Sequence, residues 1–127
     1  MKRSTFATAI NCMDGRVQLP VINYIRNMHK VDYVDLITLA GPNAVISEGK
    51  NSLTLESTRK LVEISVNLHG SNRVAIVGHY DCAGNPIDTE IQKKQIVVSI
   101  EVITTWNLNV CIIGLWIKQN WQVERVK

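Results

Sequence analysis

Four short apolar runs alternate along this chain with longer segments of helical spacing. The runs cover residues 5–11, 33–39, 73–78 and 110–115. The third run is apolar without a break from Val74 to Val77. Unbroken apolar runs are typical of strands that are covered on both faces, as they are in parallel sheets. The alternation therefore predicts an α/β fold, with a mainly parallel sheet of about four or five strands and helices on its faces.

Three segments between these runs have the spacing of amphipathic helices. The first covers residues 20–29 and has a proline in its first turn, where proline is tolerated. The second begins after Asn51 or Ser52 and ends before Gly70. The residues that share one face of this second helix are Leu53, Ser57, Leu61, Ile64, Ser65 and Leu68. The third helix is capped by Asp88 and extends to about residue 105.

The remaining segments complete the predicted path of the chain. The sequence Gly41-Pro42-Asn43 predicts a chain break after the second run. Residues 116–126 are a candidate edge strand, and Cys111 is expected to be a buried apolar side chain within the fourth strand. We expect the tryptophans to cover a sheet edge or a subunit interface; they are Trp106, Trp116 and Trp121.

Length and composition exclude several classes of protein. A chain of 127 residues, 46% hydrophobic and 20% charged, predicts a single globular domain over residues 1–127. The net charge of +3 is small and scattered, which argues against nucleic acid as a partner. No apolar stretch is long enough to span a membrane, and the start is a poor match to an export signal. We therefore expect a cytoplasmic protein whose three cysteines are reduced, and bind metal or are buried.

Two clusters of reactive side chains follow the first and third runs. Cys12, Asp14 and Arg16 come directly after the first run, and His79 and Cys82 after the third. Ligands in open α/β sheets collect at the carboxyl ends of strands, so two sulfurs and an imidazole are expected to meet there. Thiolate and imidazole suit zinc, and three protein ligands leave a fourth position open, as in catalytic sites. The alternative is a pair of buried thiols beside an ordinary helix-capping aspartate.

The two clusters together resemble the β-class carbonic anhydrases. The resemblance rests on Cys12-x-Asp14-x-Arg16 followed by His79-x-x-Cys82 after an apolar strand, and it covers about residues 5–115. It implies that Cys12, His79 and Cys82 bind Zn²⁺. It also implies that Asp14 and Arg16 form a catalytic carboxylate–guanidinium pair, in which Asp14 is a conditional fourth ligand of the zinc.

The resemblance implies an enzyme, a lyase that reversibly hydrates carbon dioxide to bicarbonate by a zinc-bound hydroxide. Asp14 would orient the hydroxide, and because two thiolates neutralise the zinc charge, activity should rise with pH. A homodimer or higher homo-oligomer is expected, with a small-molecule substrate and no membrane partner. The alternatives are a hydrolase of carbonyl sulfide or carbon disulfide on the same site, or a non-catalytic zinc-binding interaction module. Asp14 fixed permanently on the metal would mark the last of these.

Several features depart from the family pattern. Gly15 stands where serine is common, Thr38 where arginine is frequent, and Ala83 separates Cys82 from Gly84. The chain is also short for the family, without the N-terminal helices that usually embrace a partner subunit. Because a shift of about 1 Å at a site can cost 100-fold in rate, these departures put the activity, rather than the zinc, in question.

Overall fold

Five strands form one sheet in the computed structural model, which describes residues 3–127. The strands are β1 (Phe6–Cys12), β2 (Tyr33–Leu39), β3 (Arg73–His79), β4 (Cys111–Ile117) and β5 (Val123–Arg125). Their order across the sheet is β2-β1-β3-β4-β5. The first four are parallel, and β5 is an antiparallel edge strand beside β4. The predicted fold class is confirmed, and so is the edge strand within residues 116–126.

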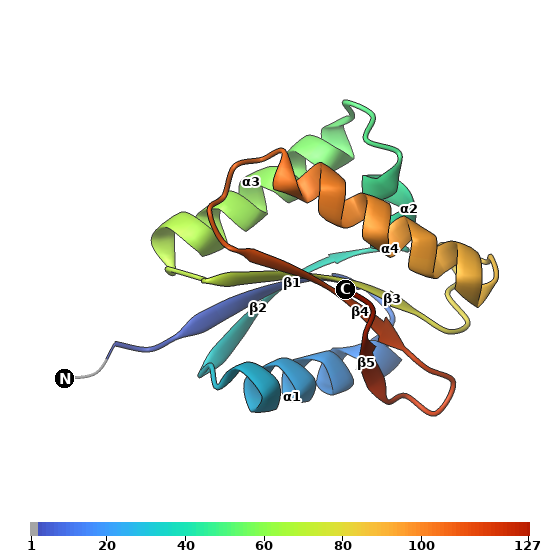
Figure 1. Cartoon of the computed structure of the whole chain (residues 1–127), viewed down its shortest axis with the longest axis horizontal. Coiled ribbons are helices and arrows are strands. Elements are labelled where there is room, and N and C mark those ends of the chain that lie inside the picture. The colour runs from blue at the N-terminus through green and yellow to red at the C-terminus, as the bar shows by residue number, and fades with distance from the viewer. Residues whose placement is uncertain (1–2) are drawn as a thin grey trace.

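Helices cover both faces of the sheet, as Figure 1 shows. The helical segments are the 3-10 turn η1 (Gly15–Val17), α1 (Gln18–His29), α2 (Pro42–Ser47), α3 (Leu53–Leu68) and α4 (Thr89–Thr104). Helix α1 lies on one face, and α2, α3 and α4 lie on the other. Among the described residues, no helix is long and apolar enough to cross a membrane.

The capping residues explain where the long helices begin. The Ser52 side chain accepts a hydrogen bond from the Leu55 backbone N–H at 3.1 Å, and Asp88 accepts one from Ile91 at 2.9 Å. Both helices begin where the sequence predicted, because each cap satisfies a backbone donor that the first turn leaves unpaired. The short helix α2 was not predicted. Its proline occupies the first turn, where no backbone N–H is needed, so Pro42 starts a helix rather than only breaking the chain.

Each face of the sheet has its own apolar core. The α1 side packs residues such as Ala9, Val21 and Leu115, and the opposite side packs Ile76 and Ile96 with their neighbours. Two of the tryptophans belong to the second core, Trp106 and Trp116. The prediction that they cover an edge or an interface is therefore wrong for these two, because the sheet and α4 leave room for large rings inside the domain.

Helix α3 is rotated relative to the face that the sequence suggested. All the apolar side chains of that face are exposed. Leu61 and Ile64 lie in the middle of the helix, and Leu53 and Leu68 lie at its two ends. The buried residues are Leu55, Thr58, Val62 and Ser65, and of these only Ser65 was on the predicted face. Two hydroxyls can be buried there because both are hydrogen-bonded: Thr58 donates to the Thr54 carbonyl, and Ser65 donates to Asp35 and contacts the hydroxyl of Thr8.

Cys111 is exposed rather than buried, so its predicted role as a core side chain is wrong. It is the first residue of β4, and the buried part of that strand begins two residues later, at Ile113. The first residue of a strand can lie outside the core. An apolar run in the sequence does not reveal at which residue the burial of the strand begins.

Strands β1 and β3 are neighbours at the centre of the sheet, and their carboxyl ends lie together. From β1 the chain passes through α1 to β2 on one side, whereas β3 lies on the other side of β1. The direction of winding therefore changes between β1 and β3. In open parallel sheets such a switch point leaves a crevice at the carboxyl ends of the strands, where ligands bind.

Candidate metal centre

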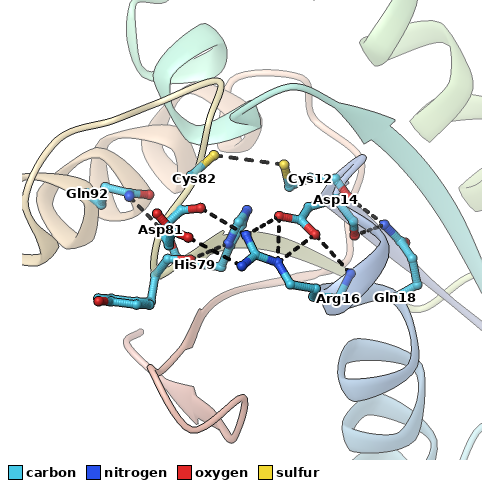
Figure 2. Close-up of polar contacts among 9 residues, drawn as sticks. Cys12, Asp14, Arg16, Gln18, His79, Asp81, Cys82 and Gln92 are labelled. Carbon is cyan, nitrogen blue, oxygen red and sulfur yellow. Dashed lines mark hydrogen bonds and ion pairs between the residues drawn. The ribbon is translucent and has the colours of Figure 1, made fainter.

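Cys12, His79 and Cys82 meet at this switch point. Cys12 ends β1, His79 ends β3, and Cys82 lies in the loop after β3. One ligand atom from each, two sulfurs and one ring nitrogen, lie within 4.8 Å of one another. The three side chains are buried, with 3%, 1% and 4% of their residue surfaces exposed. Figure 2 shows the two sulfurs facing each other across the site.

The His79 ring is oriented with one nitrogen free. Its Nδ1 lies 2.7 Å from the Tyr80 carbonyl oxygen. Because a carbonyl only accepts hydrogen bonds, Nδ1 is the donor of this contact, and Nε2 is the nitrogen that a neutral ring leaves as an acceptor. Nε2 is buried and has no hydrogen-bond partner in the described part of the chain. A buried, unpartnered nitrogen costs free energy unless something binds it, which is the expected state of a metal ligand before the metal is added.

The two thiols are close enough to share a cation. The sulfurs of Cys12 and Cys82 lie 3.9 Å apart. Burial, and secondly the nearby Cys12, raises the pKa of the Cys82 thiol to about 11. The metal-free site therefore holds Cys82 protonated at neutral pH, and a metal ion must displace that proton to bind the thiolate. Soft sulfur donors and one imidazole fit zinc well, so the residues present suit this ion.

We call Cys12, His79 and Cys82 the metal-ligand group. Beside it, the guanidinium of Arg16 binds the carboxylate of Asp14 through two of its nitrogens. Its Nε lies 3.1 and 3.2 Å from the two carboxylate oxygens, and its Nη2 donates to Oδ2 at 2.7 Å. Hydrogen bonds from the Arg16 side chain, and secondly from its backbone N–H, lower the pKa of Asp14 from 3.8 to about 2. Asp14 is therefore an ionised acceptor at neutral pH, and in this structure it pairs with Arg16.

Two further residues fix the guanidinium of Arg16. Asp81 accepts hydrogen bonds from it through Oδ2 at 3.3 Å and through its carbonyl at 3.1 Å. The Trp121 ring, in the turn before β5, lies 4.7 Å from the guanidinium carbon, which is a cation–π contact. The sequence contains no signal for the Trp121 contact, because a tryptophan in a turn carries no mark of the partner on which it stacks.

Glutamines that sequence reasoning did not single out also border the site. Gln18 and Gln92 lie on opposite sides of the metal-ligand group in Figure 2, and each donates hydrogen bonds to backbone carbonyls near a ligand. No motif reveals them, since a glutamine looks the same in a sequence pattern whether its amide contacts water or a buried carbonyl.

The three positions that depart from the family pattern lie in exposed parts of the structure. Ala83 is exposed, so its methyl group crowds nothing in the site. A Cβ added at Gly15 would meet no atom within 4 Å, so the position accepts a side chain as readily as a glycine. Thr38 is exposed near the carboxyl end of β2.

Gly84 is the glycine that the loop requires. A Cβ added there would lie 2.7 Å from the Ala40 carbonyl carbon and 2.8 Å from its Cβ, because the loop after β3 packs against the turn after β2. Gly41, in that turn, has a φ of +64°, and a Cβ added there would lie 2.8 Å from the Cβ of Asn85. The loop that carries Cys82 is therefore placed by direct backbone packing on its neighbour.

We expect Gly84→Ala to lower the free energy of unfolding by about 1–3 kcal/mol, because backbone on both sides must move apart. Urea denaturation followed by circular dichroism measures the change. Gly15→Ala is the matched control, since its methyl group enters open space, and it should change the free energy by less than about 0.5 kcal/mol. Equal midpoints for the two variants would contradict the packing described.

Comparison with known proteins points to one family and one fold. A family model described as "Putative carbonic anhydrase" matches residues 2–127. The fold resembles the β-carbonic anhydrase isoform I of Trichomonas vaginalis, at 17% identity and a TM-score of 0.66, over 99% of this chain and 86% of that one. It resembles a carbon disulfide hydrolase equally well, at 12% identity and a TM-score of 0.66, over 100% and 81% of the two chains.

A third similar structure is that of the tetrameric β-carbonic anhydrases of Sordaria macrospora. The identity is 12% and the TM-score 0.62, over 98% of this chain and 81% of that one. No curated protein matches the sequence. At these identities the structural likeness shows the fold alone, and the family model provides the link to a named family.

Proposed function

This chain belongs to the carbonic anhydrase family, and from that premise we propose that it catalyses the zinc-dependent, reversible hydration of carbon dioxide. The reaction converts CO₂ and H₂O to HCO₃⁻ and H⁺. The observation that carries the proposal is the buried group of Cys12, His79 and Cys82, in which the His79 Nε2 has no partner in the described part of the chain. A carboxylate suited to orient a nucleophile, Asp14, lies in the loop directly after Cys12.

Cys12, His79 and Cys82 would hold the zinc ion, which would supply a Lewis acid that lowers the pKa of water. Asp14 accepts the hydrogen bond that orients the attacking oxygen, because it is ionised and can only accept. Arg16 binds both carboxylate oxygens of Asp14, which would leave the fourth position of the zinc to water or substrate. Asp81 and Trp121 contact the guanidinium of Arg16 and hold it in that position.

A second enzyme function has specific support. The carbon disulfide hydrolase matches this fold as closely as the β-carbonic anhydrase of Trichomonas vaginalis does. Carbon disulfide and carbonyl sulfide are linear triatomic molecules like carbon dioxide, and the same ligands and the same Asp14–Arg16 pair would serve their hydrolysis. The walls of the site, rather than the metal ligands, would select among these substrates.

A non-catalytic zinc-binding module has less support. Its mark would be Asp14 held permanently against the metal ligands as a fourth donor. Asp14 is instead bound to Arg16 by both carboxylate oxygens. A carboxylate held away from the ligand group leaves a coordination position for water or substrate, which is the arrangement of catalytic zinc sites.

Stopped-flow measurement of carbon dioxide hydration tests the proposal, with protein of known zinc content, from neutral to alkaline pH. We expect a zinc-dependent rate that rises with pH, because two thiolates make the site less acidic than three imidazoles would. Carbon disulfide and carbonyl sulfide hydrolysis, followed by sulfide release, run in parallel. Full zinc occupancy with sulfide release alone would favour the second function, and no turnover of any substrate would favour the non-catalytic module.

The assembly and location form part of the same proposal. We expect a homodimer or larger homo-oligomer, supported by the exposed apolar side chains of α3 and by the tetrameric state of the Sordaria macrospora relatives. A cytoplasmic location is supported by the cysteines, which are all unpaired thiols in the structure. Analytical ultracentrifugation of the zinc-loaded protein measures the assembly state directly.

A further inference from the structure

Two loops supply the metal-ligand group, and in each loop two backbone carbonyls accept hydrogen bonds from the side-chain amide of one glutamine. We call residues 12–17 and 79–85 the first and second ligand loops. Gln18 Nε2 donates to the Cys12 carbonyl at 2.8 Å and to the Asp14 carbonyl at 2.7 Å. Both acceptors belong to the first ligand loop. One side chain thus binds the backbone of a metal ligand and that of the catalytic carboxylate.

Gln92 makes the corresponding contacts with the second ligand loop. Its Nε2 donates to the His79 carbonyl at 3.1 Å and to the Asn85 carbonyl at 3.3 Å. These acceptors flank Cys82, so the two hydrogen bonds join the start of the loop to its end. Gln92 comes from α4, and only 1% of its surface is exposed. Water therefore cannot replace these bonds at low cost.

A buried asparagine sets the direction of each glutamine amide. Asn11 Nδ2 donates to Gln18 Oε1 at 3.3 Å, and Asn43 Nδ2 donates to Gln92 Oε1 at 3.2 Å. Asn11 and Asn43 have 0% and 1% of their surfaces exposed. With the oxygen of each glutamine accepting from an asparagine, its NH₂ group faces the carbonyls. The same pair of residue types thus supports both ligand loops.

From this repeated arrangement we infer that Gln18 and Gln92 are the positioning residues of the metal centre. Each uses the two N–H donors of its carboxamide to hold one ligand loop, so that the three donor atoms stay together before a metal ion arrives. The inference rests on the proposed function for the identity of the ion. Groups that orient metal ligands in this way commonly contribute about 10–100-fold to metal affinity.

The role requires donors, which makes it testable by a change of one atom. Gln18→Glu and Gln92→Glu replace each NH₂ by an oxygen, which would face two carbonyl oxygens. Gln18→Met and Gln92→Met remove the donors at similar volume without adding charge, and they serve where a buried carboxylate prevents folding. Gln95→Glu is the matched control: Gln95 lies one turn further along α4 and uses Oε1 to accept from Asn43 and Asn85, a role that glutamate retains.

Zinc release to a colorimetric chelator is the first measurement, on zinc-loaded protein. We expect zinc affinity to fall about 10–100-fold in the Gln18 and Gln92 variants, and to change less than about twofold in Gln95→Glu. The midpoint of urea unfolding is measured alongside. Affinities within twofold of the parent protein in both Gln→Met variants, with the fold intact, would overturn the inference.

Hydrogen exchange of the metal-free protein is the second measurement, and it depends on neither zinc nor turnover. Substitution of Gln18 should raise exchange in the first ligand loop alone, and substitution of Gln92 in the second alone. A merely structural role would instead raise exchange across the sheet. If the parent protein bound no zinc, the proposed function would fail, whereas loop-specific exchange would still support the positioning role and unchanged exchange would refute it.

Discussion

Replacing Cys82 by serine is expected to lower zinc affinity by about 100-fold or more and to abolish turnover. Four-ligand zinc sites release about 10–16 kcal/mol on binding, or roughly 3 kcal/mol for each ligand, and about 1.4 kcal/mol corresponds to a tenfold change. A serine hydroxyl is no substitute for a thiolate at neutral pH. The side chain of serine is only slightly smaller than that of cysteine, so the loop after β3 should keep its packing. Zinc content after purification without chelator, together with competition titration, measures the effect.

Cys111→Ser is the matched control for that experiment. It makes the same chemical change at an exposed cysteine outside the metal-ligand group. Zinc content and carbon dioxide hydration should stay within about twofold of the parent protein. Near-stoichiometric zinc in Cys82→Ser, bound as tightly as in the Cys111 control, would show that Cys82 is not a ligand.

Arg16→Ala is expected to leave zinc bound and to lower the rate of carbon dioxide hydration by about 100-fold or more. Without the guanidinium, Asp14 keeps only the hydrogen bond from the backbone N–H of residue 16 to Oδ1, so Oδ2 is free to approach the metal or to point into solvent. The fold should survive, because the ion pair is partly exposed and such pairs contribute less than about 1 kcal/mol. Stopped-flow rates and zinc content, measured on the same preparation, separate the two effects.

Arg59→Ala tests whether the loss is specific to the site. Arg59 also pairs with a carboxylate, Glu63, at 3.7 Å, and its guanidinium lies 6.0 Å from the centre of a tryptophan ring, that of Trp106. It is on α3, away from the ligand loops, so turnover should stay within about twofold. A rate in Arg16→Ala within about threefold of the parent would mean that the Asp14–Arg16 pair has no catalytic role. Arg16→Lys should not restore the rate, because an ammonium cannot bind both oxygens as a fork does.

Sequence patterns predicted most of the fold because the features that carry them are local. Apolar runs and capping residues act within a few positions, and Ser52 and Asp88 start their helices as expected. The patterns failed where burial depends on a partner. Thr58 and Ser65 face the sheet because hydrogen bonds satisfy their hydroxyls, and the more apolar stripe of the same helix faces outward.

The candidate site likewise has one part that the sequence predicted and another that it did not. Cys12, His79 and Cys82 could be grouped from the sequence, because parallel strands end at the same edge of a sheet and all three lie at or within a few residues of the end of an apolar run. The residues that orient this group could not be found from the sequence, since no motif marks which carbonyl or guanidinium a side chain contacts, even where the partner is only a few positions away. Gln92 binds the loop that precedes its own helix, and Trp121 stacks on Arg16 from the opposite end of the chain.

The sequence by itself determined the order of the strands and the long helices and the set of donor atoms, because spacing and side-chain chemistry are properties of the chain alone. Only the tertiary structure decided which atoms orient those donors. The His79 tautomer depends on the Tyr80 carbonyl, the direction of Asp14 depends on Arg16, and the ligand loops depend on Gln18 and Gln92. Hydrogen bonds require distances near 3 Å and suitable angles, and folding alone brings such pairs into reach.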